Sequence, residues 1–162
     1  MKSLTLIAIA LFIVSLTAVF FYDSNQLTHK QPAFQFKPLY AFAPGDAVSA
    51  FNAFFFVFIV SLLLFGMGSV VAMILEGLKY GYLLFSAFNG VAVSGFHVFD
   101  LLFVIPQIMA CVAATTLGAG LILDYRGKSS LFPYWNYAVR YFFFGIAVTG
   151  ALLLIRPIMV SL

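Results

Sequence analysis

The stretch that decides the fold is residues 51–123, FNAFFFVFIVSLLLFGMGSVVAMILEGLKYGYLLFSAFNGVAVSGFHVFDLLFVIPQIMACVAATTLGAGLIL. It is almost entirely apolar; its charged residues are Glu76, Lys79 and Asp100, and His97 joins them when protonated. About 20 apolar residues cross the roughly 30 Å hydrocarbon layer of a membrane. A run this long therefore predicts several membrane-spanning helices that pack against one another.

The composition of the whole chain supports the same class. Hydrophobic residues make up 64% of the 162 residues and charged residues only 8%, whereas soluble domains are roughly half apolar and a quarter charged. A soluble domain of this length lacks the volume to bury so much apolar surface. We expect a single all-α integral membrane domain, surrounded by a lipid bilayer.

Charge and cysteine content argue against two other classes. The net charge of +3 comes from single Lys and Arg residues near the expected span ends, which is typical of topology determinants rather than of a nucleic-acid surface. The only cysteine is Cys111, so neither an intramolecular disulfide nor a Cys-x-x-Cys site is possible.

Apolar runs predict a polytopic helical bundle of about five spans, at residues 4–22, 47–75, 80–95, 98–123 and 137–160. We interpret the first run as a retained anchor, since it exceeds the usual 7–15-residue core of a signal peptide and lacks a small-x-small cleavage site. The run at 80–95 covers only about 24 Å. It either lies in thinned bilayer or stops short of crossing.

The segments between these spans are polar or contain proline. Residues 23–49 are expected to form an extramembrane loop, because Pro32, Pro38 and Pro44 exclude a regular helix. The sequence Glu76-Gly77-Leu78-Lys79 predicts a tight polar turn between the second and third spans, and Pro106 predicts a kink in the fourth.

Basic residues give the expected orientation in a cell membrane. A cytoplasmic N-terminus places five of them inside and three outside, and the loop at 23–49 is then extracytoplasmic. The inner five are Lys2, Lys79, Arg126, Lys128 and Arg140, and the outer three are Lys30, Lys37 and Arg156. Both Arg140 and Arg156 lie near ends of the last span, from which they can snorkel to the interface.

The central region resembles the stage II sporulation protein M family of membrane proteins. The resemblance rests on Asn52, Gly66, EGLKYG at 76–81, GFHVFD at 95–100 and GAG at 118–120. It departs from the family pattern in three places: the asparagine is single, Glu76 replaces another asparagine, and the His-to-acid spacing is one residue shorter. The resemblance implies five spans, a cytoplasmic N-terminus and a scaffold role; family members in sporulating bacteria work in a complex that remodels the septal wall.

Small and amide residues inside the spans predict close helix packing. Short residues let helix backbones approach, and buried amides need interhelical hydrogen bonds worth about 1 kcal/mol each. The candidate packing or structural residues are Asn52, Gly66, Gly77, Gly81, Asn89, Gln107 and Gly118.

Three residues are candidates for a polar or ion site, because ionisable groups at membrane depth are costly. His97 and Asp100 are three residues apart. They can lie at the membrane interface, where Asp100 or Ser94 helps to cap the fourth span, or they can contact another span or act in a proton relay or metal site. Glu76 can pair with Lys79 or accept hydrogen bonds from a neighbouring helix.

Three functions remain open from the sequence. The first is a non-catalytic scaffold or accessory subunit that contacts other membrane proteins, because the short loops leave no soluble domain for chemistry. The second is a small oligomeric transporter or channel lined by Glu76, Asn89, His97 and Asp100. The third is a subunit of a membrane enzyme complex that holds a lipid, quinone or metal through His97. We predict no catalytic residue, cofactor or metal in the chain itself, and no nucleic-acid partner.

Overall fold

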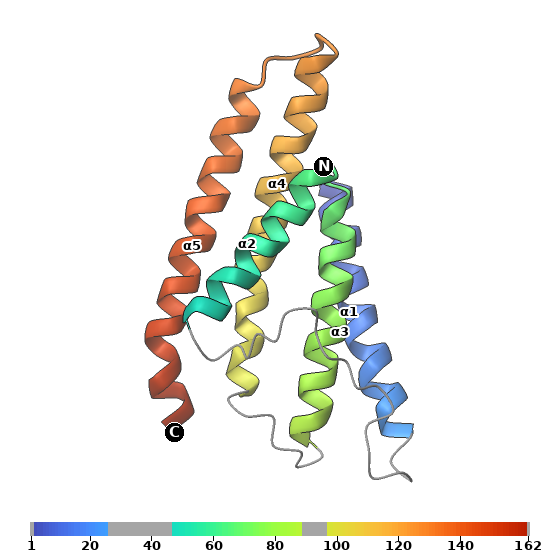
Figure 1. Ribbon diagram of the computed structural model, residues 1–162, viewed down its shortest axis with the longest axis vertical. Helices are drawn as coiled ribbons and strands as arrows, with labels where there is room; N and C mark the ends of the chain where they lie inside the picture. The colour runs from blue at the N-terminus through green and yellow to red at the C-terminus, as the bar shows by residue number, and fades with distance from the viewer. Residues whose placement is uncertain (1, 26–46, 89–96, 162) are drawn as a thin grey trace.

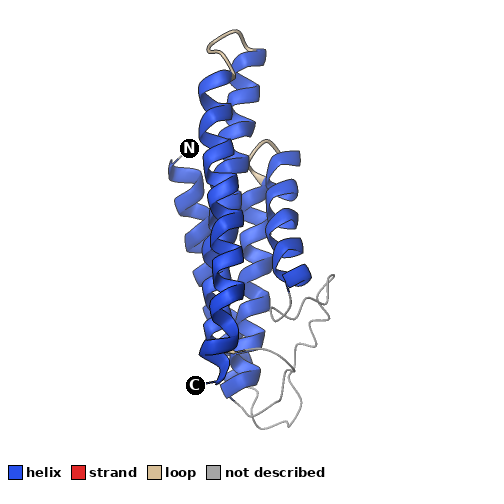
Figure 2. Ribbon diagram, turned by 90° about the vertical axis from the view of Figure 1, so that its left-hand side faces the viewer, coloured by secondary structure: helices blue, strands red, loops and turns tan. Residues whose placement is uncertain are grey.

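The computed structural model describes residues 2–25, 47–88 and 97–161, and all of the regular structure in these residues is helical (Figures 1 and 2). This confirms the predicted all-α helical bundle. The elements are α1 (Lys2–Asn25), α2 (Ala47–Leu63), α3 (Gly68–Phe88), the 3-10 helix η1 (Val98–Phe103), α4 (Val104–Tyr125) and α5 (Phe132–Ser161).

Successive helices run in opposite directions and form a layered bundle (Figure 1). The α1 helix packs mainly against α3, α2 contacts both α3 and α4, and α5 packs mainly against α4. The start of α1, the turn between α2 and α3 and the loop between α4 and α5 lie toward one end, and the C-terminus lies at the other. The tip of the α4–α5 hairpin projects beyond the α2–α3 turn in both views (Figures 1 and 2).

Three helical segments among the described residues are long and apolar enough to cross a membrane: Gly68–Phe88, Val98–Tyr125 and Phe132–Ser161. The α2 helix is apolar but has 17 residues, and the described side chains of α1 form a shorter apolar stretch, Leu6–Val19. The membrane-type helices expected from the composition are therefore present.

The predicted spans at 4–22, 98–123 and 137–160 match α1, the η1–α4 segment and α5 within a few residues. The spans at 47–75 and 80–95 are wrong. The chain reverses at residues 64–67, and one helix, α3, continues through the expected polar turn at 76–79. With 21 residues, α3 is long enough to cross, unlike the short third span that the sequence predicted.

Glycine creates the turn between α2 and α3. Gly66 has φ +93°, and Phe65 also takes the left-handed conformation with φ +49°. Only glycine adopts such angles without a steric penalty. The Gly66 N–H donates to the Ser61 carbonyl at 2.7 Å, and the Ser69 hydroxyl donates to the Gly66 carbonyl at 2.6 Å. These bonds satisfy the backbone groups that the reversal would otherwise leave unpaired.

Close helix contact explains the interior of the bundle. A Cβ atom at Gly77 would lie 2.5 Å from the carbonyl oxygen of Phe12, and one at Gly81 would lie 2.6 Å from that of Leu16. The α1 and α3 backbones therefore touch along a Gly-x-x-x-Gly line, as small residues permit in membrane helices. The buried core contains Ala8, Phe12, Phe54, Val57, Ala72, Met73, Tyr80, Leu83, Val104, Ala110 and Cys111.

Two other expectations concern the chain between the helices. The loop predicted at 23–49 is shorter at both ends, since 23–25 belong to α1 and 47–49 to α2; residues 26–46 lie outside the described residues. The kink expected at Pro106 inside the fourth span has no such place in the structure: Pro106 lies in the first turn of α4, directly after the 3-10 helix η1, where a helix tolerates proline.

Candidate polar site inside the bundle

The first candidate site is an ion pair in the middle of α3. Glu76 and Lys79 are one helical turn apart, and the Lys79 ammonium contacts Oε2 of Glu76. Their side chains are 0% and 6% exposed. The expected contact between the two residues is confirmed, but its place is inside a helix and not in a turn. Because the two charges neutralise each other, α3 can carry both of them through the core.

Gln107 of α4 joins this pair from the neighbouring helix. Its Nε2 donates a hydrogen bond of 3.0 Å to Oε2 of Glu76, which confirms that Glu76 accepts a hydrogen bond from another span. The Gln107 side chain is buried, and its Oε1 has no hydrogen-bond partner within the described part of the chain. Glu76, Lys79 and Gln107 therefore form one buried cluster, called the α3–α4 cluster below.

A small cavity adjoins the α3–α4 cluster. Its volume is about 10 Å³, close to the space that one water molecule needs. Tyr80 is 1% exposed, and its ring centroid lies 4.9 Å from Nζ of Lys79, a distance that suits a cation–π contact. The residues that line the cavity are Ser49, Ala50, Ala53, Lys79, Tyr80, Phe103 and Gln107.

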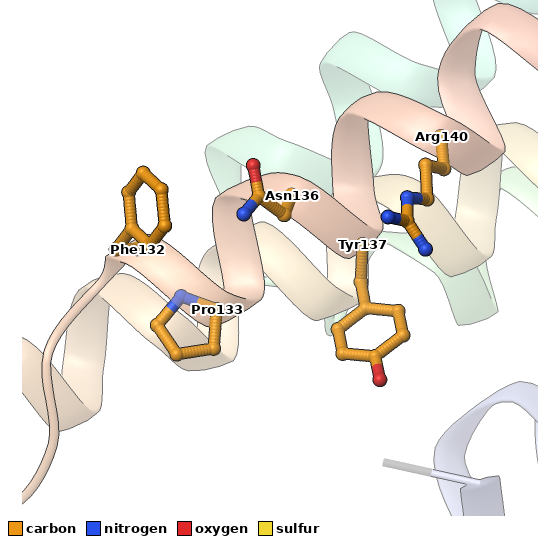
Figure 3. A pocket seen from close by; sticks show the side chains of 5 residues that line it. All are labelled: Phe132, Pro133, Asn136, Tyr137 and Arg140. Carbon is orange, nitrogen blue, oxygen red and sulfur yellow. The ribbon is translucent and has the colours of Figure 1, made fainter.

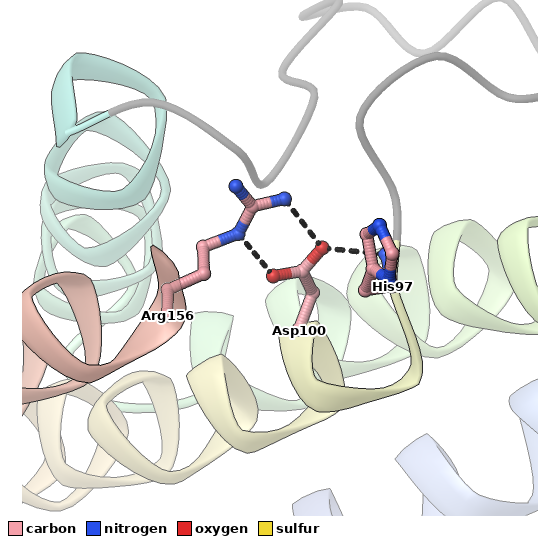
Figure 4. A network of polar contacts seen from close by, with 3 residues as sticks. All are labelled: His97, Asp100 and Arg156. Carbon is pink, nitrogen blue, oxygen red and sulfur yellow. Dashed lines mark hydrogen bonds and ion pairs between the residues drawn. The ribbon is translucent and has the colours of Figure 1, made fainter. Parts of the chain in front are cut away.

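The second candidate site joins the start of η1 to the end of α5 (Figure 4). The Arg156 guanidinium donates from Nε to Oδ1 of Asp100 at 2.7 Å and from its terminal nitrogen to Oδ2 at 3.1 Å. This fork-to-fork geometry makes a strong charge-assisted pair. The explanation of Arg156 by snorkelling alone is therefore wrong: the guanidinium reaches a buried carboxylate 56 residues away in sequence.

Asp100 also caps the helix start, as expected. The backbone N–H of His97 donates to Oδ2 of Asp100 at 2.8 Å, and the Asp100 N–H donates to the His97 carbonyl at the same distance. Asp100 is fully buried, whereas His97 is exposed. The carboxylate therefore holds η1 and α5 together, and the imidazole of His97 lies at the edge of the structure.

The structure divides the three candidates of the polar site between two places. Glu76 belongs to the α3–α4 cluster, and His97 and Asp100 belong to the contact with Arg156. Asp100 precedes Gln107 by seven residues, about 10 Å along the helix axis. Sequence reasoning missed Arg156 as a partner. Its signal was a charge near the end of the last apolar run, where a buried carboxylate can serve as its counter-charge.

The packing candidates fall into three groups. Gly66 makes the turn, Gly77 and Gly81 contact α1, and a Cβ atom at Gly118 would lie 2.6 Å from the Phe65 carbonyl carbon. Asn52 is exposed on α2, so the expected packing role is wrong for this residue; its amide lies on the outer face of a short helix. Asn89 lies outside the described residues.

Metal-ligating side chains are dispersed. Among the side chains that the structure describes, no three from His, Cys, Asp or Glu gather at one point. Cys111 is buried, and its Sγ lies 3.8 Å from Oγ of Ser61, a contact between α4 and α2. What the two polar sites offer chemically is charge neutralisation and hydrogen bonding between helices.

Comparisons of this chain with known protein families, with curated proteins and with solved structures found no match. The resemblance to the stage II sporulation protein M family therefore stays a prediction from the sequence.

Proposed function

We propose that this chain is a non-catalytic, membrane-embedded subunit that acts as a scaffold or accessory component of a larger membrane complex. The observation that carries the proposal is the low burial of α5. In the most apolar 18-residue window of α5 only 11% of residues are buried, against 56% in α3 and in the η1–α4 segment. Most of the surface of this 30-residue helix is therefore not covered by the described part of the chain.

Gly150 supports protein rather than lipid as the proposed neighbour of this face. In the described helix interiors, glycines sit where a Cβ atom would collide: Gly77 and Gly81 meet α1, and Gly145 meets Phe54. At Gly150 no atom of the described residues lies within 4 Å of the Cβ position. Glycine destabilises a helix by about 1 kcal/mol relative to alanine. In membrane helices, glycine usually occurs where another helix packs closely against it. A transmembrane helix of another subunit fits this surface.

The surroundings of Gly150 suit helix contact. Ala147 and Ala151 are exposed on α5, one turn apart, and form a small-x-x-x-small pair beside the glycine. Phe143 and Leu154 are also exposed and border these small residues along the helix. Small residues of this kind, flanked by bulky ones, let the backbone of a second helix approach closely.

Native mass spectrometry of the protein, gently extracted from its own membrane, tests the proposal. We expect a stoichiometric assembly with at least one different chain. Replacing Gly150 by Leu should dissociate this assembly and leave the thermal unfolding temperature of the isolated chain unchanged. A homo-oligomer alone, or an assembly that tolerates Gly150→Leu, contradicts the proposal.

The α3–α4 cluster favours a second candidate function, a small oligomeric transporter. A carboxylate, an ammonium and an amide meet beside a cavity inside an apolar bundle, and such groups mark ion or proton paths in many transporters. Ion or proton flux into liposomes that contain the purified protein tests this function. Glu76→Gln should abolish the flux, because it removes the charge and keeps the shape; equal flux from protein-free liposomes rejects the transporter.

A further inference from the structure

We propose that the first turns of α5 carry a binding site for the phosphate of an anionic phospholipid headgroup, with Arg140 as its charged ligand. The site is a surface pocket of about 310 Å³ lined by Phe132, Pro133, Asn136, Tyr137 and Arg140 (Figure 3). This volume is at the lower end of the range for small-ligand pockets, about 300–1,000 Å³. The proposal does not depend on the scaffold function.

The pocket lies on the side of α5 that faces away from the bundle. Ala138 is 4% exposed and points inward, and Asn136 and Arg140 are two residues before and after it. Two residues turn a helix by about 200°, so both side chains lie opposite to Ala138. Figure 3 shows them on one face with Tyr137. A ligand of this pocket therefore comes from the membrane or the solution and not from the bundle.

The position of the pocket across the membrane suits a lipid headgroup. Arg156, at the other end of α5, is held by Asp100, and Tyr137 precedes it by 19 residues, about 28 Å of helix. This is close to the roughly 30 Å thickness of the hydrocarbon layer. Trp135 and Tyr141 are exposed beside the pocket, as expected for aromatic residues at an interface. When the Arg156 end of α5 lies at one membrane interface, the pocket lies at the opposite interface.

The chemistry of the lining suits a phosphate ester. Arg140 is exposed, and no hydrogen bond or ion pair occupies its guanidinium within the described part of the chain. A guanidinium binds two phosphate oxygens at once, and the Asn136 amide and Tyr137 hydroxyl can donate two further bonds. Phe132 and Pro133 add an apolar wall for the glycerol portion, which a free phosphate would leave uncovered.

Charge on this side of the bundle favours an anionic lipid. The exposed residues Arg126, Lys128 and Arg140 outweigh Asp124 by two positive charges, whereas Arg156 at the opposite end is neutralised by Asp100. Positive residues accumulate on the cytoplasmic side of membrane proteins. Anionic lipids give that leaflet its negative surface potential. The pocket therefore faces the leaflet that supplies its ligand.

The test compares lipid retention by the full chain in nanodiscs of equal parts phosphatidylglycerol and phosphatidylcholine. Native mass spectrometry counts the lipids that stay bound after release. We expect the protein to retain phosphatidylglycerol preferentially, and Arg140→Gln to reduce this preference about fivefold or more. The matched control is Arg126→Gln, which removes the same charge from the same side outside the pocket and should leave the preference within about twofold.

Two further experiments and one comparison between the variants complete the test. Tyr137→Phe removes a single hydroxyl and should weaken retention without affecting folding, which keeps the proposal testable if Arg140→Gln unfolds. An equal loss in Arg126→Gln and Arg140→Gln would indicate general surface charge and overturn the site. Inorganic phosphate is the competitor: complete displacement of the lipid by millimolar phosphate would assign the pocket to a soluble anion and overturn the lipid.

Discussion

The α3 and α5 helices show which property decides burial in this bundle. The mean hydropathy of the most apolar window is 1.4 in α3 and 2.0 in α5, yet 56% of the α3 window is buried and only 11% of the α5 window. Mean hydropathy alone does not set burial, because the η1–α4 segment also has a mean hydropathy of 2.0 and is 56% buried. In lipid, an apolar side chain gains little by leaving the hydrocarbon, whereas polar and small residues gain protein neighbours. For this reason α3 is largely buried, and its buried polar and small residues include Glu76, Gly77, Lys79 and Gly81.

The largest effect should come from Lys79→Met, which leaves the Glu76 carboxylate without its cation in the core. Breaking a buried ion pair on one side costs about 3–5 kcal/mol, so we expect a loss of this size in SDS-titration unfolding in mixed micelles. The double variant Glu76→Gln with Lys79→Met should regain most of the loss, because Gln107 can still bond a neutral amide. A double variant as unstable as the single one would show that the pair does not position α3.

The next effect concerns the contact between α1 and α3. Gly77→Leu would push a side chain into the Phe12 carbonyl, which lies 2.5 Å from the Cβ position. Backbone atoms cannot move aside as a flexible side chain can, and we expect a loss of about 3 kcal/mol, at the upper end for overpacking. The same unfolding assay measures it. Cross-linking of cysteines introduced on α1 and α3 should fail at the same time if the helices separate.

A smaller effect is expected at the contact that joins Arg156 of α5 to Asp100. Asp100→Asn removes the counter-charge of Arg156 and should cost about 1.5 kcal/mol, since a partly exposed guanidinium can turn to solvent or headgroups. The unfolding assay should show a smaller loss than for Lys79→Met. Proteolysis near the C-terminus should become faster, because Arg156 fastens the end of α5. A loss as large as at Lys79 would mean that α5 is held as firmly as α3.

The same contrast explains how much of the fold the sequence could predict. The apolar runs gave the class and the approximate ends of α1, α4 and α5. The turn at 64–67 was missed because Leu64, Phe65 and Met67 are apolar; its only signal was the pair of glycines at 66 and 68. A turn was instead expected at Glu76, where charges in an apolar run usually mark an end.

The candidate site was predicted in its members but not in its arrangement. Glu76, Gln107 and Asp100 stood out because they are polar residues in apolar runs. Spacing within one helix revealed the pairing of Glu76 with Lys79, three residues apart. It could not reveal that Arg156 reaches Asp100, because that contact depends on how α5 packs against η1. Contacts between distant segments are set by packing, which a single sequence does not display.

The smallest effect on stability is expected at Gly150 of α5. Gly150→Leu places a large side chain where nothing lies within 4 Å of the Cβ position, so no contact within the described chain is lost. Leucine also favours a helix over glycine by about 0.8 kcal/mol, and we expect an unfolding free energy unchanged or slightly higher, against the loss at Gly77. The same leucine should keep a helix of another subunit from approaching this face. A stable monomer that no longer assembles would show that glycine has two different roles in this chain. In α3 it lets the protein's own helices pack closely, and in α5 it lets a helix of another subunit do so. A destabilised monomer would instead mean that the Gly150 side of α5 packs against its own bundle.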